Sequence, residues 1–117
     1  MGGWSSKSAI GDPAAFVQSS IASAKASGSV LIFSKSYCPC CTSSKRSIAT
    51  LNCPVTIIEL DQLGEPRNGP VQQALKEITW VLSCPQVFGK DGEFMGDDGE
   101  VQRAFRNGSL EKRLGLL

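Results

Sequence analysis

The sequence predicts an α/β fold in which a four-stranded mixed sheet is flanked by helices on both faces. Three observations lead to this prediction. Residues 30–33 are an apolar run, residues 39–51 follow with a helix-like pattern, and residues 55–60 have high β-propensity. A strand, a crossover helix and a second strand of this kind should be parallel and right-handed. Residues 86–88 and 93–95 then flank a Gly-Lys-Asp-Gly turn, which is the pattern of a hairpin.

The elements are expected in the order α-β-α-β-α-β-β-α. Asp12-Pro13 resembles a cap followed by a first-turn proline, and it opens a helix that runs to Ser27 and is closed by Gly28. The strand at residues 30–33 is apolar throughout, so it is expected to be central in the sheet. A helix over about residues 39–51 and a strand over residues 55–60 come next.

The second half of the chain completes the sheet. Glycine and proline mark residues 61–70 as a loop, and a helix is expected over about residues 71–81, with Val71, Leu75 and Ile78 on one face. After the hairpin, residues 96–100 begin another helix, which Asn107-Gly108 stops, and residues 110–117 are expected to dock as a final helical turn. Four strands in one sheet with helices on both faces form a thioredoxin-like arrangement, in one domain over residues 12–117.

The composition is typical of an ordinary globular domain, with 117 residues of which 41% are hydrophobic and 20% charged. The net charge of +1 gives no indication of a nucleic-acid partner or an acidic substrate. The chain has no histidine, which excludes His-based zinc sites, Ser-His-Asp triads and Cys-His nucleophile pairs. No apolar run is long enough to span a bilayer, and the N-terminus lacks the apolar core of a secretory signal.

Five cysteines are present: Cys38, Cys40, Cys41, Cys53 and Cys84. An odd number with three in four residues is a poor framework for structural disulfides. The pattern favours a reducing compartment, and a cytoplasmic location is expected.

Cys38 and Cys41 form a Cys-x-x-Cys pair at the point where a buried strand is expected to turn into a helix. The first turn of a helix has free backbone N–H groups and a partial positive charge, which favour a thiolate and lower its pKa. Lys35, Lys45 and Arg46 add positive charge nearby in the sequence. The pair is therefore interpreted as a thiol–disulfide redox motif rather than as two inert buried thiols.

Residues 33–41 read Phe-Ser-Lys-Ser-Tyr-Cys-Pro-Cys-Cys and resemble the active-site segment of the dithiol glutaredoxins, Phe-Ser-Lys-Ser-Tyr-Cys-Pro-Tyr-Cys. Only Cys40 differs. Ser83-Cys84-Pro85 is similar to the family's Thr-Val-Pro, and the turn at residues 96–100 is similar to its glycine-rich turn. The resemblance implies a thioredoxin-like fold and reduction of protein disulfides and protein–glutathione mixed disulfides, with glutathione as electron donor.

The resemblance assigns roles to the active-site segment. Cys38 is the nucleophile and Cys41 the resolving thiol, while Lys35 and Tyr37 contact glutathione. The expected partners are therefore glutathione and disulfide-containing or glutathionylated proteins, and the protein is expected to act as a monomer.

The resemblance also places glutathione contacts later in the chain. Cys84 offers its backbone N–H and C=O to the peptide part of glutathione, and Pro85 is expected to follow a cis peptide bond. Asp97 and Asp98 belong to the turn that binds the γ-glutamyl end. Since Asp97 stands where the family has glycine, the acidic group is expected to be shifted to Asp98.

Several alternatives remain open at this point. The chain could be a dimer that binds a [2Fe-2S] cluster through glutathione, or a thioredoxin-type protein disulfide reductase. No other metal is expected. Cys40 could be a bystander, a second resolving thiol or a site of overoxidation. Cys84 could pack in the interior or form a disulfide with an active-site thiol, and Cys53 could be structural or peripheral.

The first eleven residues are rich in glycine and serine, and a flexible tail is expected there. Met1-Gly2 opens a sequence that matches the pattern for N-myristoylation, which is either a chance match or a site for an acyl chain on Gly2. One acyl chain would hold a membrane only weakly.

Overall fold

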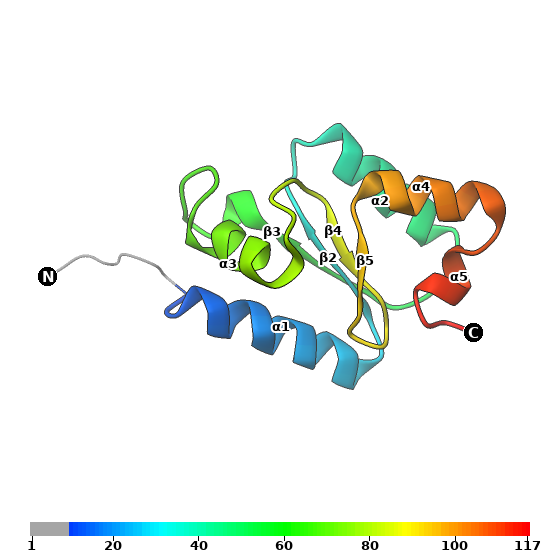
Figure 1. The fold of residues 1–117 in the computed structure, drawn as a ribbon, viewed down its shortest axis with the longest axis horizontal. Helices are drawn as coiled ribbons and strands as arrows, with labels where there is room; N and C mark the ends of the chain where they lie inside the picture. Colours follow the sequence, from blue (N-terminus) through cyan, green and yellow to red (C-terminus); the bar gives the residue numbers. More distant parts are fainter. Residues whose placement is uncertain (1–9) are drawn as a thin grey trace, which may run out of the picture.

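Four strands form one sheet in the order β3-β2-β4-β5, and helices cover both of its faces (Figure 1). The computed structural model describes residues 10–117. The acylation pattern and most of the predicted tail at residues 1–11 fall outside these described residues. The predicted fold class is confirmed, because the element order and the mixed sheet are those expected from the sequence.

Helix α1 spans Pro13–Ser27, as the sequence predicts. The Asp12 carboxylate accepts hydrogen bonds from two backbone N–H groups of the first turn, those of Ala14 and Ala15. At the other end Gly28 adopts a left-handed conformation, which lets its N–H bond to carbonyls of the last turn.

The central strand is β2 (Val30–Ser34), and every residue of it is buried. It pairs in parallel with β3 (Val55–Glu59), with Val30 opposite Val55, and antiparallel with β4 (Gln86–Phe88). Strand β5 (Phe94–Gly96) completes the hairpin beyond β4. The apolar run at residues 30–33 therefore has the central place predicted for it.

The sheet separates two cores. Leu31 and Phe33 of β2 face the layer that contains α1 and α3 (Pro70–Thr79), whereas Val30 and Ile32 face the other side. That second layer contains α2 (Pro39–Ala49), α4 (Asp98–Asn107) and α5 (Leu110–Arg113) (Figure 1). Helix α2 is thus fixed on one face at the end of the central strand.

Helix α3 buries only part of the apolar face predicted for it. Val71 and Leu75 are fully buried, whereas Ile78 is 37% exposed. The polar residues Gln72 and Thr79 are buried instead, because their side chains form hydrogen bonds to residues 81–86. The helix is rotated toward that segment, which carries Cys84.

The remaining connection is short. A 3-10 turn, η1 (Leu60–Gln62), follows β3, and Leu60, which was predicted to end the strand, is buried in this turn instead.

Within residues 10–117, no helix combines the length and apolar character needed to cross a membrane.

Candidate active site

The Cys-x-x-Cys pair lies where β2 passes into α2. Cys38 has extended backbone geometry and is the N-cap of α2, and Pro39 occupies the first helical position, where no N–H is needed. Cys38 is partly exposed, whereas Cys41, three residues along the same side of the helix, is fully buried. The pair therefore has one accessible and one protected sulfur.

The surroundings of Cys38 favour its ionised form. Partial burial acts to raise the pKa of the Cys38 thiol, but the backbone N–H and the thiol of Cys41 act against it. The backbone N–H of Cys40 and the charge of Lys35 add to the lowering, and the net result is a Cys38 pKa below its ordinary value. This is the effect expected for a thiol at a helix N-terminus.

Cys41 has the opposite character. Burial raises the pKa of its thiol to about 12, although the Lys35 backbone N–H donates to Cys41 Sγ at 3.4 Å and opposes the rise. The negative charge of Cys38 raises it further. Of the two thiols, Cys38 is therefore the one that ionises at the lower pH.

Hydrogen bonds to Glu59 and Asp61 hold the end of β2 and the loop between β2 and α2 in place. The backbone N–H and the hydroxyl of Ser36 donate to the Asp61 carboxylate at 2.9 and 2.5 Å, and these bonds keep the pKa of Asp61 below its usual range. Ser34 donates to Glu59, which also pairs with Lys45 at 2.6 Å. Lys45, which the sequence placed among the charges near the thiols, is thus paired with Glu59.

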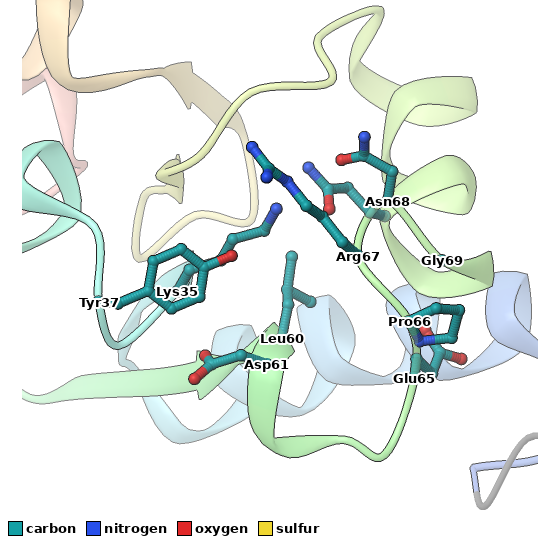
Figure 2. Close-up of a pocket in the computed structure, with 10 residues that line it drawn as sticks. Lys35, Tyr37, Leu60, Asp61, Glu65, Pro66, Arg67, Asn68 and Gly69 are labelled. Carbon is teal, nitrogen blue, oxygen red and sulfur yellow. The ribbon is translucent and has the colours of Figure 1, made fainter.

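A groove runs from Cys38 toward the segment ahead of α3. Two adjoining hollows share Lys35, Tyr37, Arg67, Asn68 and Gln72, and they form this groove. In Figure 2, Lys35 and Tyr37 come from the loop after β2, and Arg67 and Asn68 come from the segment that leads into α3. Tyr37 is 63% exposed, so its ring is available to a bound molecule.

The segment that carries Cys84 closes the same groove. Leu82, Ser83 and Cys84 line the hollow together with Cys38, and Cys38 Sγ lies 3.9 Å from the Cys84 carbonyl oxygen. The Cys84–Pro85 peptide bond is cis, which confirms the prediction for Pro85. The structure thus brings Lys35, Tyr37 and Cys84 together around Cys38.

Asp97 and Asp98 lie elsewhere, beside Cys40. Asp97 is the N-cap of α4 and accepts from the Glu100 N–H at 3.4 Å, while Asp98 accepts from the Ser44 hydroxyl at 2.7 Å. Some desolvation and the charges of Asp98, Cys38 and Asp97 raise the pKa of the Cys40 thiol. Neither aspartate lines the groove beside Lys35 and Tyr37.

Of the five residues that both hollows share, three were not predicted from the sequence: Arg67, Asn68 and Gln72. Arg67 and Asn68 fall in a stretch whose glycines and prolines indicated only a loop. Gln72 is a polar residue on a helix that was predicted from its apolar residues alone. The one sequence feature that could have indicated Arg67 as a groove residue is its positive charge in a loop just before a helix.

Within residues 10–117, no group of three or more Cys, Asp or Glu side chains is arranged to hold a metal ion. The site itself offers the accessible Cys38 thiol with the buried Cys41 thiol behind it. Sulfur chemistry of this kind on this sheet topology defines a class, the thiol–disulfide oxidoreductases of the thioredoxin-like fold.

The comparisons with known proteins narrow the class to one family. A sequence model described as Glutaredoxin matches residues 30–95, which is more than half of the chain. The chain belongs to the glutaredoxin family. Glutaredoxins are glutathione-dependent thiol oxidoreductases, so the protein is an enzyme of that kind.

Individual relatives cover most of the chain. Glutaredoxin-C4 of Arabidopsis thaliana is 35% identical over 111 residues, which are 95% of this chain and 77% of the relative. Glutaredoxin-1 of Rhizophagus irregularis is 39% identical over 88 residues, which are 75% of this chain and 84% of the relative.

Solved structures agree with the fold. The crystal structure of oxidized glutaredoxin 2 from Chlamydomonas reinhardtii is similar with a TM-score of 0.74 and 32% identity, over 90% of this chain and 95% of that one. A buckwheat glutaredoxin–glutathione complex is similar with a TM-score of 0.66 and 28% identity, over 85% of this chain and 90% of that one.

Proposed function

We propose that the protein reduces protein disulfides by a dithiol route, with Cys38 as nucleophile and Cys41 as resolving thiol. The observation that carries the proposal is the contrast between the two sulfurs: the pKa of the partly exposed Cys38 is lowered, and burial raises the pKa of Cys41 to about 12. The first step of a dithiol route is attack on the disulfide by an accessible thiolate. The second step is attack on the resulting mixed disulfide by a neighbouring thiol.

In the first step, the Cys38 thiolate attacks one sulfur of the substrate disulfide, and the other sulfur leaves as a thiolate that takes up a proton. Cys41 then loses its proton and attacks Cys38 Sγ, which releases the second substrate thiol and leaves a Cys38–Cys41 disulfide. Two glutathione molecules reduce this disulfide and become one oxidised glutathione.

A glutathionylated protein takes a shorter path. Cys38 attacks the glutathione sulfur, and the protein thiolate leaves and takes up a proton. A second glutathione then attacks the sulfur of the glutathione bound to Cys38, which gives oxidised glutathione and returns the Cys38 thiolate. Cys41 takes no part in these steps.

The groove is suited to glutathione, which carries two carboxylates and an extended peptide backbone. Lys35 and Arg67 line it and supply positive charge, and the main chain of Cys84 lies beside the Cys38 sulfur. The buckwheat relative was solved as a complex with glutathione, which supports glutathione as the ligand.

The proposal extends to where and how the protein works. All five cysteines are free thiols, which supports a reducing compartment such as the cytoplasm. The two thiols and the groove come from one chain, which supports action as a monomer.

A coupled assay separates this function from that of a thioredoxin-type reductase. With a small glutathione mixed disulfide as substrate, we expect turnover with glutathione and glutathione reductase, at a rate at least about tenfold above that with thioredoxin reductase. Equal or faster turnover with thioredoxin reductase would overturn the proposed use of glutathione. The same protein assayed without either reductase is the control for background exchange.

Arg67 provides a test of the groove. Reversal of its charge in Arg67→Glu is expected to raise the KM for glutathione by about tenfold, because an attraction to a carboxylate becomes a repulsion, with a much smaller change in kcat. Steady-state kinetics at fixed substrate measures the split. Arg106→Glu, which changes a cation at the end of α4, is the matched control. An unchanged KM in Arg67→Glu would place glutathione outside this groove.

A further inference from the structure

A third sulfur, that of Cys84, lies at the same groove as the active pair. Cys84 is partly buried and lines the hollow that Cys38 also lines. Its carbonyl oxygen is 3.9 Å from Cys38 Sγ, so the main chain at position 84 is in contact with the reactive sulfur. The mechanism described above uses this backbone but leaves the Cys84 thiol without a role.

The surroundings of the Cys84 thiol include a hydrogen-bond donor and a positive charge. The side-chain amide of Gln72 donates to the Leu82 carbonyl at 2.6 Å and lies 3.9 Å from Cys84 Sγ as a second, weaker donor contact. Burial raises the pKa of Cys84 to about 11, and the charge of Lys35 acts in the opposite direction. Burial also raises the pKa of Cys41, so either thiol has to lose a proton before it can attack.

The other two cysteines are less well placed. Cys40 is exposed beside Asp98, whose charge disfavours its thiolate, and it does not line the groove. Cys53 is packed against the core on the α2 face of the sheet, with Ile48 and its neighbours. Cys84 is thus the one sulfur, besides Cys38 itself, that lines the described groove.

We propose that Cys84 is a second resolving thiol, which attacks Cys38 Sγ in the mixed disulfide with glutathione. The proposal rests on the proposed function, because it needs Cys38 to form that mixed disulfide. The Cys84 thiol loses its proton, a Cys38–Cys84 disulfide forms, and glutathione leaves as a thiolate that takes up a proton. Two further glutathione molecules reduce the new disulfide and are oxidised to one oxidised glutathione.

The test uses the full chain with Cys40→Ser and Cys41→Ser, which leaves Cys84 as the sulfur nearest to Cys38. The reduced protein is treated with oxidised glutathione, then alkylated, and its intact mass is followed with time. We expect a glutathione adduct that decays to a species without glutathione in which only Cys53 is alkylated, because Cys38 and Cys84 are joined. After trypsin digestion, a disulfide should join the peptide of residues 36–45, which contains Cys38, to the peptide of residues 77–90, which contains Cys84.

The comparison protein carries Cys84→Val in addition, a change close in volume, and Cys84→Ser is prepared as a second variant. In both, the adduct on Cys38 is expected to persist at least about tenfold longer. Cys53→Ser in the same background should decay like the test protein, and circular dichroism checks that each variant is folded.

Two results would overturn the proposal, and they differ. If the adduct forms on Cys38 and persists equally with and without the Cys84 thiol, Cys84 does not resolve it, and the proposed function stands. If no adduct forms on Cys38 in any variant, the proposed role of Cys38 fails as well.

Discussion

The Cys38→Ser variant is expected to lose at least about a thousandfold in turnover of both protein disulfides and glutathione mixed disulfides. The serine hydroxyl does not ionise near neutral pH, so the features that favour a Cys38 thiolate have nothing to act on. Those features are the helix start, the backbone N–H groups of Cys40 and Cys41 and the charge of Lys35. The glutathione-coupled assay measures the loss.

Cys53→Ser is the matched control, since it makes the same chemical change at a cysteine that packs against the core on the α2 face and does not line the groove. It is expected to keep wild-type turnover within about twofold. Residual activity in Cys38→Ser above a few per cent would show that another sulfur is the nucleophile.

Removal of both candidate resolving thiols, in Cys41→Ser combined with Cys84→Val, is expected to separate the two activities. Reduction of a protein disulfide should fall by at least about a hundredfold, because the mixed disulfide on Cys38 has no internal thiol to resolve it. Turnover of a small glutathione mixed disulfide should stay within about threefold of wild type, since free glutathione resolves that intermediate. The ratio of the two rates is the measured quantity.

The double variant is compared with Cys40→Ser, which removes an exposed thiol and leaves both resolving thiols in place. That variant should reduce both substrates. If the double variant loses both activities together, glutathione does not resolve the intermediate and the monothiol path is wrong. If it loses neither, the dithiol path is not the route for protein disulfides.

Much of the fold could be predicted because local signals agree with the tertiary structure. Asp12 and Gly28 mark the ends of α1 by capping chemistry, and the apolar run at residues 30–33 reaches the centre of the sheet. The cis bond before Pro85 was predicted from the resemblance of a three-residue segment. In each case the structural feature is formed by the same residues whose types predicted it.

The groove could be predicted only in part. Lys35 and Tyr37 lie next to Cys38 in the sequence, whereas Arg67 and Gln72 reach it only through the packing of the segment before α3 and of α3 itself. The burial of Gln72 is a related case, because helical spacing does not show its hydrogen bond to the Leu82 carbonyl. Long-range contacts of this kind have no local sequence signal.

The surroundings of Asp98 illustrate the same limit. Its expected contact with glutathione stays a prediction, whereas its contacts within the protein had no sequence signal: its carboxylate accepts from Ser44 and lies beside Cys40. The hydroxyl of Ser44 is fully buried on α2, and nothing in its sequence context indicates a partner 54 residues away. The hydrogen bond joins α4 to the active-site helix.

The central claim is that the Cys38 thiol ionises at a lower pH than an ordinary cysteine and Cys41 at a higher one, and alkylation rates test it most directly. The fully reduced protein is treated with iodoacetamide at a series of pH values, and modification of each cysteine is followed by peptide mass spectrometry. Since the pKa of Cys38 is lowered, its rate should reach half of its plateau below the value of an ordinary cysteine, about 8.5. Cys41 should stay slow until far above that pH. A Cys38 midpoint at or above the ordinary value, or Cys41 reacting first, would contradict the account.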